Sequence, residues 1–175
     1  MPQDLGFSFD ISASGEELLN GSGQLERITW LTKRIRQGDF FLLQDGSYSR
    51  LLLSELLECF VGGHFIATSI LGFSLIERSI AGRLAFNGDA KKSEAKSVEL
   101  LNAAKERGWL TESEFHVLDK LREMRNPLVH FHAQESPTRP EVKATEMGSS
   151  TAQLLELEAR QILEAAIRFL GKTAL

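Results

Sequence analysis

Apolar side chains recur every three or four residues along most of this chain, the spacing that gathers them on one face of an α-helix. A helical body is expected to start near Ser49, with one apolar stripe from Leu52 to Phe60. Gly62-Gly63 then either breaks the chain or lets two backbones approach closely. A longer stripe follows the glycines, and only Glu77 interrupts its apolar character. Its apolar members are Ile66, Ile70, Phe73, Ile80 and Leu84. The pattern predicts two consecutive helices with buried faces.

Three further helices are expected toward the C-terminus. The first covers roughly Ser93 to Arg107 and ends at a glycine. The next begins at Glu112, because Thr111 and Glu114 have the spacing of a capping box. Its inward positions are Phe115, Leu118, Leu121 and Leu128. The last helix starts near Thr151, with Leu155, Ile162, Ala166 and Phe169 facing inward.

Residues 1–48 form an N-terminal extension with a different pattern. The alternation from Leu5 to Ile11 suits either a short strand or an extended arm that lies on the body or on another subunit. A short helix follows from Leu25 to Ile35 and is expected to stop at Gly38. We therefore predict an all-α, up-and-down bundle of about four to five core helices over residues 49–175. Residues 133–150 are expected to form a loop that is mobile in part.

Composition narrows the class of protein. The chain has 175 residues, a formal net charge of −4 and one cysteine, Cys59, so an intramolecular disulfide is excluded and a reducing compartment is favoured. Residues 59–76 carry no charge, but their glycines and hydroxyl side chains favour a buried core helix over a membrane span. The first residues lack the pattern of a signal peptide, and we expect a cytoplasmic protein without a membrane partner.

No metal or cofactor is expected. The sequence Gly171-Lys172-Thr173 imitates the end of a phosphate-binding loop, but Ala166 stands where that motif needs glycine. His130 and His132 would point about 200° apart on a helix, so they would not share a metal ion there. His64 and His116 have no companion ligands in the sequence.

The segment from Arg125 to His130 holds the candidate chemistry. Arg125 continues the inward stripe of its helix, so its charge needs a partner, and Glu77 is the obvious one. Asn126-Pro127 is expected to break the helix, with Asn126 capping a new turn. On an unbroken helix, Arg125 and His130 would lie about 140° apart, whereas a bend brings them to a common side.

At these residues the sequence resembles the HEPN superfamily (higher eukaryotes and prokaryotes nucleotide-binding domains), over about Ser49 to Leu170. The signature of that superfamily is an arginine, often followed by asparagine, and then a histidine after four to six residues. Here four residues separate Arg125 from His130, and Asn126 follows the arginine. The segment around Glu77 also looks like the acid-bearing second helix of the family.

The resemblance implies a metal-independent ribonuclease, commonly the toxin of a defence or toxin–antitoxin pair, that acts as a homodimer on RNA. His130 is then the general acid or base and Arg125 stabilises the phosphate, with Glu77 and Asn126 in supporting roles. Family members paired with a nucleotidyltransferase antitoxin carry a tyrosine two residues after the histidine. His132 occupies that position here and offers a second proton-transfer group.

Two other interpretations remain open at this stage. In the first, Arg125 and Glu77 form a buried ion pair and His130 only fixes helix packing, so the protein is a non-catalytic module that binds a partner protein or a nucleotide. In the second, the chain is a transcription-associated regulator of the same fold. Its acidic total counts against direct binding to duplex DNA.

Overall fold

The computed structural model describes residues 21–35 and 47–173, and these residues form eight helices without a strand. The predicted all-α fold is confirmed. The alternation from Leu5 to Ile11 and the expected stop at Gly38 lie outside the described residues. The helices are α2 (Gly21–Thr32), α3 (Ser47–Gly62), α4 (Phe65–Phe86), α5 (Ala90–Ser93), α6 (Ser97–Glu106), α7 (Glu112–Val129), α8 (Pro140–Glu146) and α9 (Thr151–Thr173).

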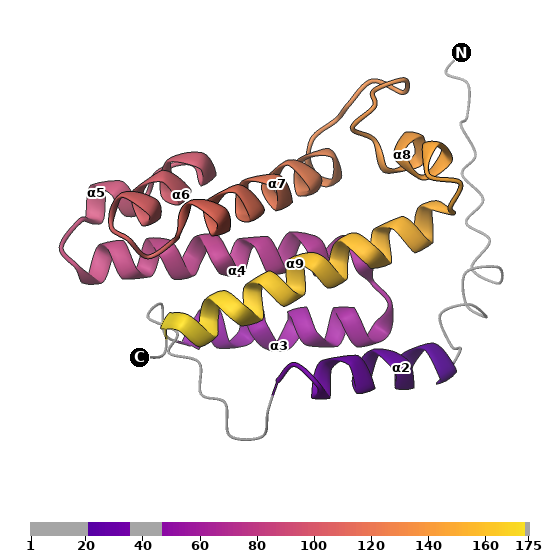
Figure 1. The fold of residues 1–175 in the computed structure, drawn as a ribbon. Helices are drawn as coiled ribbons and strands as arrows, with labels where there is room; N and C mark the ends of the chain where they lie inside the picture. Colours follow the sequence, from indigo (N-terminus) through magenta and orange to yellow (C-terminus); the bar gives the residue numbers. More distant parts are fainter. Residues whose placement is uncertain (1–20, 36–46, 174–175) are drawn as a thin grey trace, which may run out of the picture.

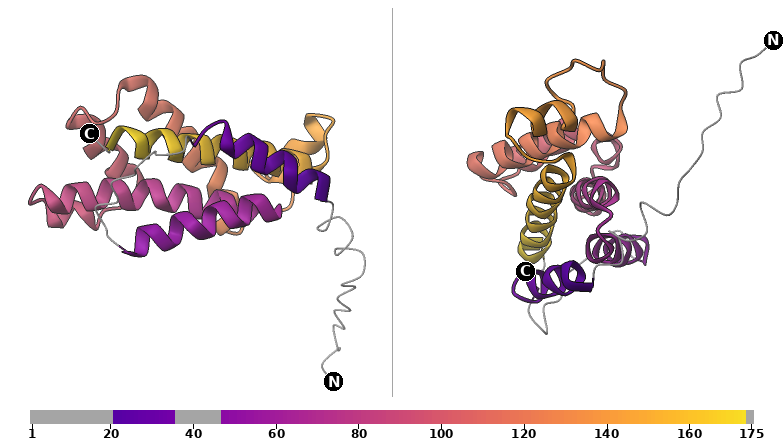
Figure 2. Two further views of the ribbon diagram at one scale, coloured as in Figure 1. Left: turned by 90° about the horizontal axis from the view of Figure 1, so that it is seen from below. Right: turned by 90° about the vertical axis from the view of Figure 1, so that its right-hand side faces the viewer.

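Helices α4 and α9 cross in the middle of the bundle (Figure 1). Helices α6 and α7 cover one side of α4, and α3 and α2 lie on the other side, as the two further views also show (Figure 2). Helix α7 ends at the same end of the bundle at which α3 connects to α4 and α8 and α9 begin (Figure 1). The connection from α3 to α4 and the connections from α7 through α8 to α9 therefore lie at this end of the bundle.

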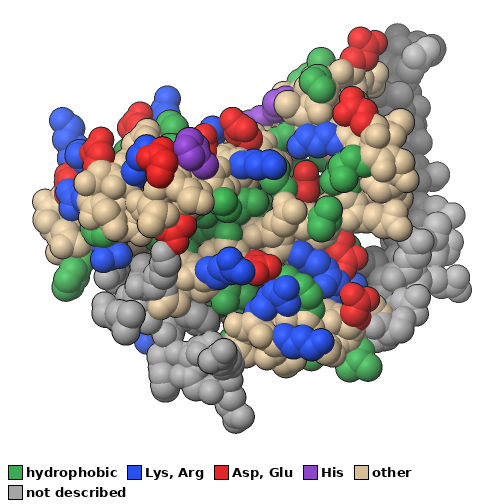
Figure 3. Space-filling model, viewed as in Figure 1, with side chains coloured by type: hydrophobic (Ala, Val, Ile, Leu, Met, Phe, Trp, Pro, Cys, Tyr) green, Lys and Arg blue, Asp and Glu red, His purple; other side chains and the backbone are tan. Residues whose placement is uncertain are grey.

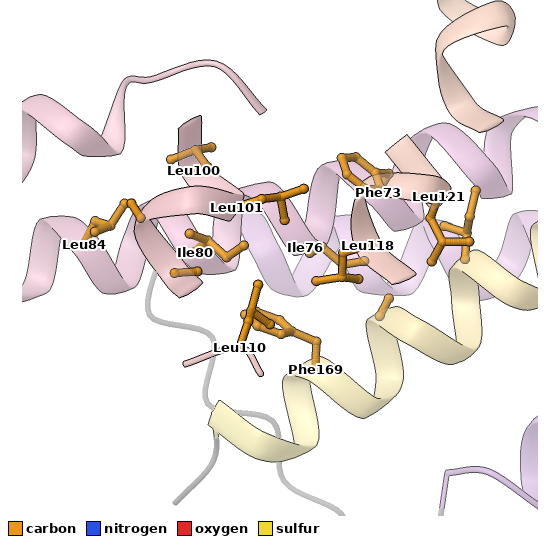
Figure 4. Packing of buried hydrophobic residues seen from close by; sticks show 14 of the residues in the cluster. Phe73, Ile76, Ile80, Leu84, Leu100, Leu101, Leu110, Leu118, Leu121 and Phe169 are labelled. Atoms are coloured by element: carbon orange, nitrogen blue, oxygen red, sulfur yellow. The ribbon is translucent and has the colours of Figure 1, made fainter. Parts of the chain in front are cut away.

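The larger hydrophobic core lies between α4, α6, α7 and α9 (Figure 4). Phe73, Ile76 and Ile80 of α4 are fully buried there, and Leu118 and Leu121 of α7 pack onto them as the sequence predicted. Met124 is also buried, although the apolar stripe did not include it. At Gly72 the helices α4 and α9 approach so closely that a β-carbon would lie 2.9 Å from Ile162 Cγ2.

A second cluster packs α2, α3 and α9 against the other side of α4. Its buried residues are Leu31, Leu52, Leu56, Phe60, Leu75, Leu163, Ile167 and Leu170. Among the described helices, α4 alone is long and apolar enough to cross a membrane by length and composition. It packs on both sides within this bundle, although the uncharged stretch 59–76 is divided between the end of α3 and the start of α4.

Local sequence signals set several helix ends. Gly63 has a φ of +82°, a conformation that favours glycine, and it separates α3 from α4 as expected. The predicted capping box at the start of α7 is present, because Thr111 Oγ1 accepts from the Glu114 backbone N–H and the Glu114 carboxylate accepts from the Thr111 backbone N–H. These backbone groups would otherwise lack helical partners.

Two expectations about helix boundaries are wrong. The helix predicted over roughly Ser93 to Arg107 is α6 and begins later than expected, at Ser97, while Ser93 ends the separate short helix α5. The loop predicted over 133–150 contains helix α8, which begins at Pro140. Proline fits the first position of a helix because a backbone N–H at that position would have no partner within the helix.

Candidate functional site

Helix α7 does not end at Asn126-Pro127, so the predicted break of the helix is wrong. The helix continues through Pro127 to Val129, and the chain turns at His130, which is extended with φ −122° and ψ 143°. Pro127 lies in the last turn of the helix, where its missing N–H removes a single helical hydrogen bond. The His130 backbone N–H still donates to the Asn126 carbonyl at 3.0 Å.

Arg125 points into the bundle and pairs with Glu77, as the sequence predicted. Its Nη2 donates to Glu77 Oε1 at 3.0 Å, and its guanidinium carbon lies 5.0 Å from the centre of the Phe73 ring. The two side chains are 13% and 20% exposed, so water reaches the pair poorly. Ser97 of α6 also donates to Glu77 Oε1, and the ion pair therefore joins α4, α6 and α7.

Asn126 bonds within its own helix and does not cap a new turn. In the amide orientation that satisfies both polar atoms, its nitrogen donates to the Arg122 carbonyl at 3.1 Å. Its oxygen accepts from the Arg122 guanidinium at 3.2 Å. Asn126 thus supports the last turns of α7.

An open pocket of about 380 Å³ lies beyond the end of α7. His130 and His132 both line it, together with Arg139 at the start of α8. The backbone is extended at His130, where the chain leaves α7, and Phe131 and His132 line the same pocket. Its apolar and small lining residues are Ile66, Pro127, Leu128, Phe131, Pro140, Thr151 and Leu155, and Glu141 completes it.

Polar contacts orient two of these side chains. His132 Nδ1 lies 3.0 Å from Thr138 Oγ1, which fixes one edge of the imidazole. Arg139 donates from Nε and Nη2 to the carboxylate of Glu141 at 3.2 and 3.1 Å. This bidentate contact raises the pKa of Arg139 and lowers the pKa of Glu141, so both groups stay charged.

The structure therefore divides the predicted site residues into two groups. Arg125, Glu77 and Asn126 hold the interior and the last turns of α7, and none of them lines the pocket. His130 and His132 line the pocket. Acid–base chemistry on a phosphate ester needs two groups that exchange protons and a cation, and His130, His132 and Arg139 can supply them.

Sequence reasoning missed Arg139 and Thr138 as neighbours of the histidines. Both fall in the segment that was predicted to be a loop. The signal that could have found Arg139 is Pro140, because proline at the first helical position marks a helix start and places the preceding residue at its N-cap.

Other parts of the described chain offer less chemistry. No group of three or more metal-ligating side chains occurs among the described residues. Cys59 has its pKa raised by burial and by the neighbouring Glu55 and Glu58, so its thiol stays protonated and is a weak nucleophile. The furrow between α7 and α9 holds two larger pockets of about 560 and 420 Å³, whose linings mix apolar side chains with charged ones such as Arg168 and include no histidine (Figure 3).

Comparison with known proteins gives no relative. No protein-family model matches the chain, and no curated protein and no solved structure matches it.

Proposed function

We propose that this protein cleaves RNA without a metal ion, and that the pocket lined by His130 and His132 is the active site. The observation that carries the proposal is the presence of both imidazoles and of Arg139 around one open pocket of about 380 Å³. The arginine–asparagine–histidine signature at the end of a helix in an all-α bundle supports the same function. The proposed reaction is cleavage of a ribose–phosphate bond.

In this reaction one imidazole removes the proton from the ribose 2′-hydroxyl, and the 2′-oxygen attacks the adjacent phosphorus. The bond from phosphorus to the 5′-oxygen breaks, and the second imidazole donates its proton to that leaving oxygen. The products are a 2′,3′-cyclic phosphate and a 5′-hydroxyl. We assign these two proton transfers to His130 and His132. The stabilisation of charge on the phosphate is assigned to the Nη1 group of Arg139, because the contact of Arg139 with Glu141 uses Nε and Nη2.

Arg125 takes a different role in this proposal from the one that the family resemblance implies. Its Nη2 is occupied by Glu77, and its side chain is 13% exposed. We therefore propose that Arg125 is a positioning residue, which ties α7 to α4 and so fixes the place where His130 leaves the helix. Asn126 supports the same turn through Arg122.

The experiment is an assay of RNA cleavage in the presence of a chelator. The purified protein is expected to cut single-stranded RNA, and His130→Asn and His132→Asn are expected to reduce the rate by about 100-fold or more, the usual worth of a proton-transfer group. His116→Asn is the matched control, because His116 is exposed and lies at the other end of α7, beside Glu112. If the His130 and His132 variants cut as fast as the control, this assignment is refuted.

A second function is favoured by a specific observation, the enclosed ion pair between Arg125 and Glu77. If this pair and its neighbours only stabilise packing, the protein is a non-catalytic helical module that binds a partner protein or a nucleotide. That function predicts no cleavage, and it predicts that changes at Arg125 or His130 weaken stability or association instead. A transcription-associated regulator is a special case of this second function.

The wider setting is part of the same proposal. A cytoplasmic location, assembly as a homodimer and control by an antitoxin or regulatory protein all come from the family resemblance. Sedimentation of the purified chain tests the homodimer, and copurification from its own host tests the antitoxin.

A further inference from the structure

Phe131 is the most exposed of the large hydrophobic side chains in the described part of the chain. It is 93% exposed, whereas the next one, Phe86, is 82% exposed. An aromatic ring in water gains nothing from the folding of its own chain, because burial is what makes such a side chain stabilising. The exposed ring of Phe131 therefore suggests a role in contact with a ligand or a partner, and its surroundings indicate which.

Phe131 stands between the two histidines of the pocket and contributes to the same lining. Phe131 follows His130, whose backbone is extended, and its ring is almost fully exposed beside the two histidines. A ring at this place lies one residue from each proton-transfer group. A ligand whose phosphate sits between the histidines reaches the ring with its next flat group.

We infer that Phe131 is a stacking platform for a nucleobase next to the cleaved phosphate, and that the substrate is single-stranded RNA. This inference rests on the proposed function. Every base has a flat face that stacks on an aromatic ring, and the contact needs an unpaired, unstacked base. Phenylalanine has no hydrogen-bonding group, so the platform selects single strands without selecting a particular base.

The surroundings of the pocket fit a strand that continues past one nucleotide. A second pocket of about 920 Å³ lies next to the first, because Ile66 and Leu155 line both, and we call the two neighbouring pockets the trough. Arg27 lines this second pocket and has no carboxylate partner among the described residues. The trough thus pairs an exposed ring with a cation for the phosphates that follow.

The charged residues that line the trough balance, with Arg27 and Arg139 against Glu141 and Glu156. Glu141 pairs with Arg139 at 3.1 Å, and Glu156 pairs with Arg160 at 2.7 Å, while Arg160 also pairs with Glu26 at 3.0 Å. Around Phe131 itself the lining holds two imidazoles and the Arg139 guanidinium. These groups favour a phosphate-bearing strand over an apolar protein surface as the ligand that covers Phe131.

The test compares Phe131→Ala with Phe131→Trp, and Phe86→Ala is the matched control at the far end of α4. Binding is measured by fluorescence anisotropy with a short 2′-O-methyl oligoribonucleotide, which has no free 2′-hydroxyl to attack. Cleavage is measured in parallel with unmodified single-stranded RNA and with an RNA duplex. Phe131→Ala is expected to weaken binding of the single strand by about 5- to 150-fold, the loss typical of one stacked base. Phe131→Trp and Phe86→Ala are expected to bind as the wild type does.

The outcomes separate this inference from the proposed function. If the wild type cleaves RNA and Phe131→Ala binds and cleaves single strands equally well, the inference is wrong and the proposed function stands. If no RNA is cleaved but Phe131→Ala still weakens binding, the stacking platform stands and the nuclease does not. Equal cleavage of the duplex and the single strand by the wild type overturns the inference. So does a Phe131→Ala variant that loses self-association and leaves binding of the oligonucleotide unchanged, because Phe131 is then a subunit contact.

Discussion

Replacing Glu77 by leucine and Arg125 by methionine, singly and together, measures what the enclosed ion pair contributes to folding. Glu77→Leu leaves a guanidinium with only the Phe73 ring beside it, and its Nε already has no hydrogen-bond partner. Arg125→Met leaves a carboxylate with only the Ser97 hydroxyl. Each single change therefore strands a charge in a poorly hydrated place. The double change removes both charges and leaves apolar side chains of similar length.

The size of the effect follows from the exposure of the pair. Stranding one partner of a fully buried pair costs about 3–5 kcal/mol, whereas exposed pairs contribute about 0–1 kcal/mol. Side chains that are 13% and 20% exposed lie nearer to the first case. We expect each single variant to lose about 2–4 kcal/mol of unfolding free energy. The double variant should lose less than the sum by about 1–3 kcal/mol.

Urea denaturation followed by far-ultraviolet circular dichroism gives the four unfolding free energies. The denaturant dependence should be the same in all four proteins, which checks that they unfold in the same way. Losses that add within about 0.5 kcal/mol would refute the account of the pair, because independent sites add and coupled ones do not. Cleavage by the double variant then assigns the role of Arg125. If the double variant still cleaves RNA, Arg125 is a positioning residue. If the double variant is stable but does not cleave RNA, Arg125 is assigned to stabilising the phosphate.

Four further measurements test other parts of the structure. Burial raises the pKa of Glu158 above its ordinary value of 4.5, so the folded state holds this proton more tightly than the unfolded state. The contribution of Glu158 to stability therefore falls as pH rises through the raised pKa. The unfolding free energy of Glu158→Gln minus that of the wild type should rise over this pH range, and a fall would contradict the raised pKa. Lys143→Ala removes the cation 3.6 Å from Glu158 and should cost about 1–3 kcal/mol at neutral pH by calorimetry, whereas an unchanged stability would contradict the pairing. Thr111→Ala should cost about 0.5–2 kcal/mol in the same measurement, and Thr111→Ser should restore most of it. The raised pKa of Cys59 should slow its alkylation by iodoacetamide at neutral pH relative to free cysteine, and an equal rate by mass spectrometry would be inconsistent with it.

Features fixed by local chemistry were predictable from the sequence. The capping box at Thr111 and Glu114 needs only residues three apart, and the break at Gly63 needs only a residue that accepts a positive φ. The pairing of Arg125 with Glu77 was also predictable, because each charge interrupts an apolar stripe and an isolated buried charge is costly.

Features that depend on packing were not predictable in the same way. A proline in the last turn removes only one helical hydrogen bond, so contacts elsewhere in the fold decide whether the helix continues past it. In this fold α7 continues to Val129, and the expected break before Pro127 was wrong. The approach of α8 to the end of α7 brings Arg139 to His130 and His132, although the arginine is separated from them by a loop. Sequence spacing carries no information about such a contact.

The central claim is tested most directly by one measurement of RNA cleavage over pH in the presence of a chelator. The account predicts cutting that yields 2′,3′-cyclic phosphate ends, with a bell-shaped dependence of rate on pH, because one imidazole must be neutral and the other protonated. His130→Asn and His132→Asn should abolish the two limbs, while His116→Asn keeps the wild-type profile. A protein that leaves RNA intact under these conditions, or whose cutting survives both substitutions, would contradict it.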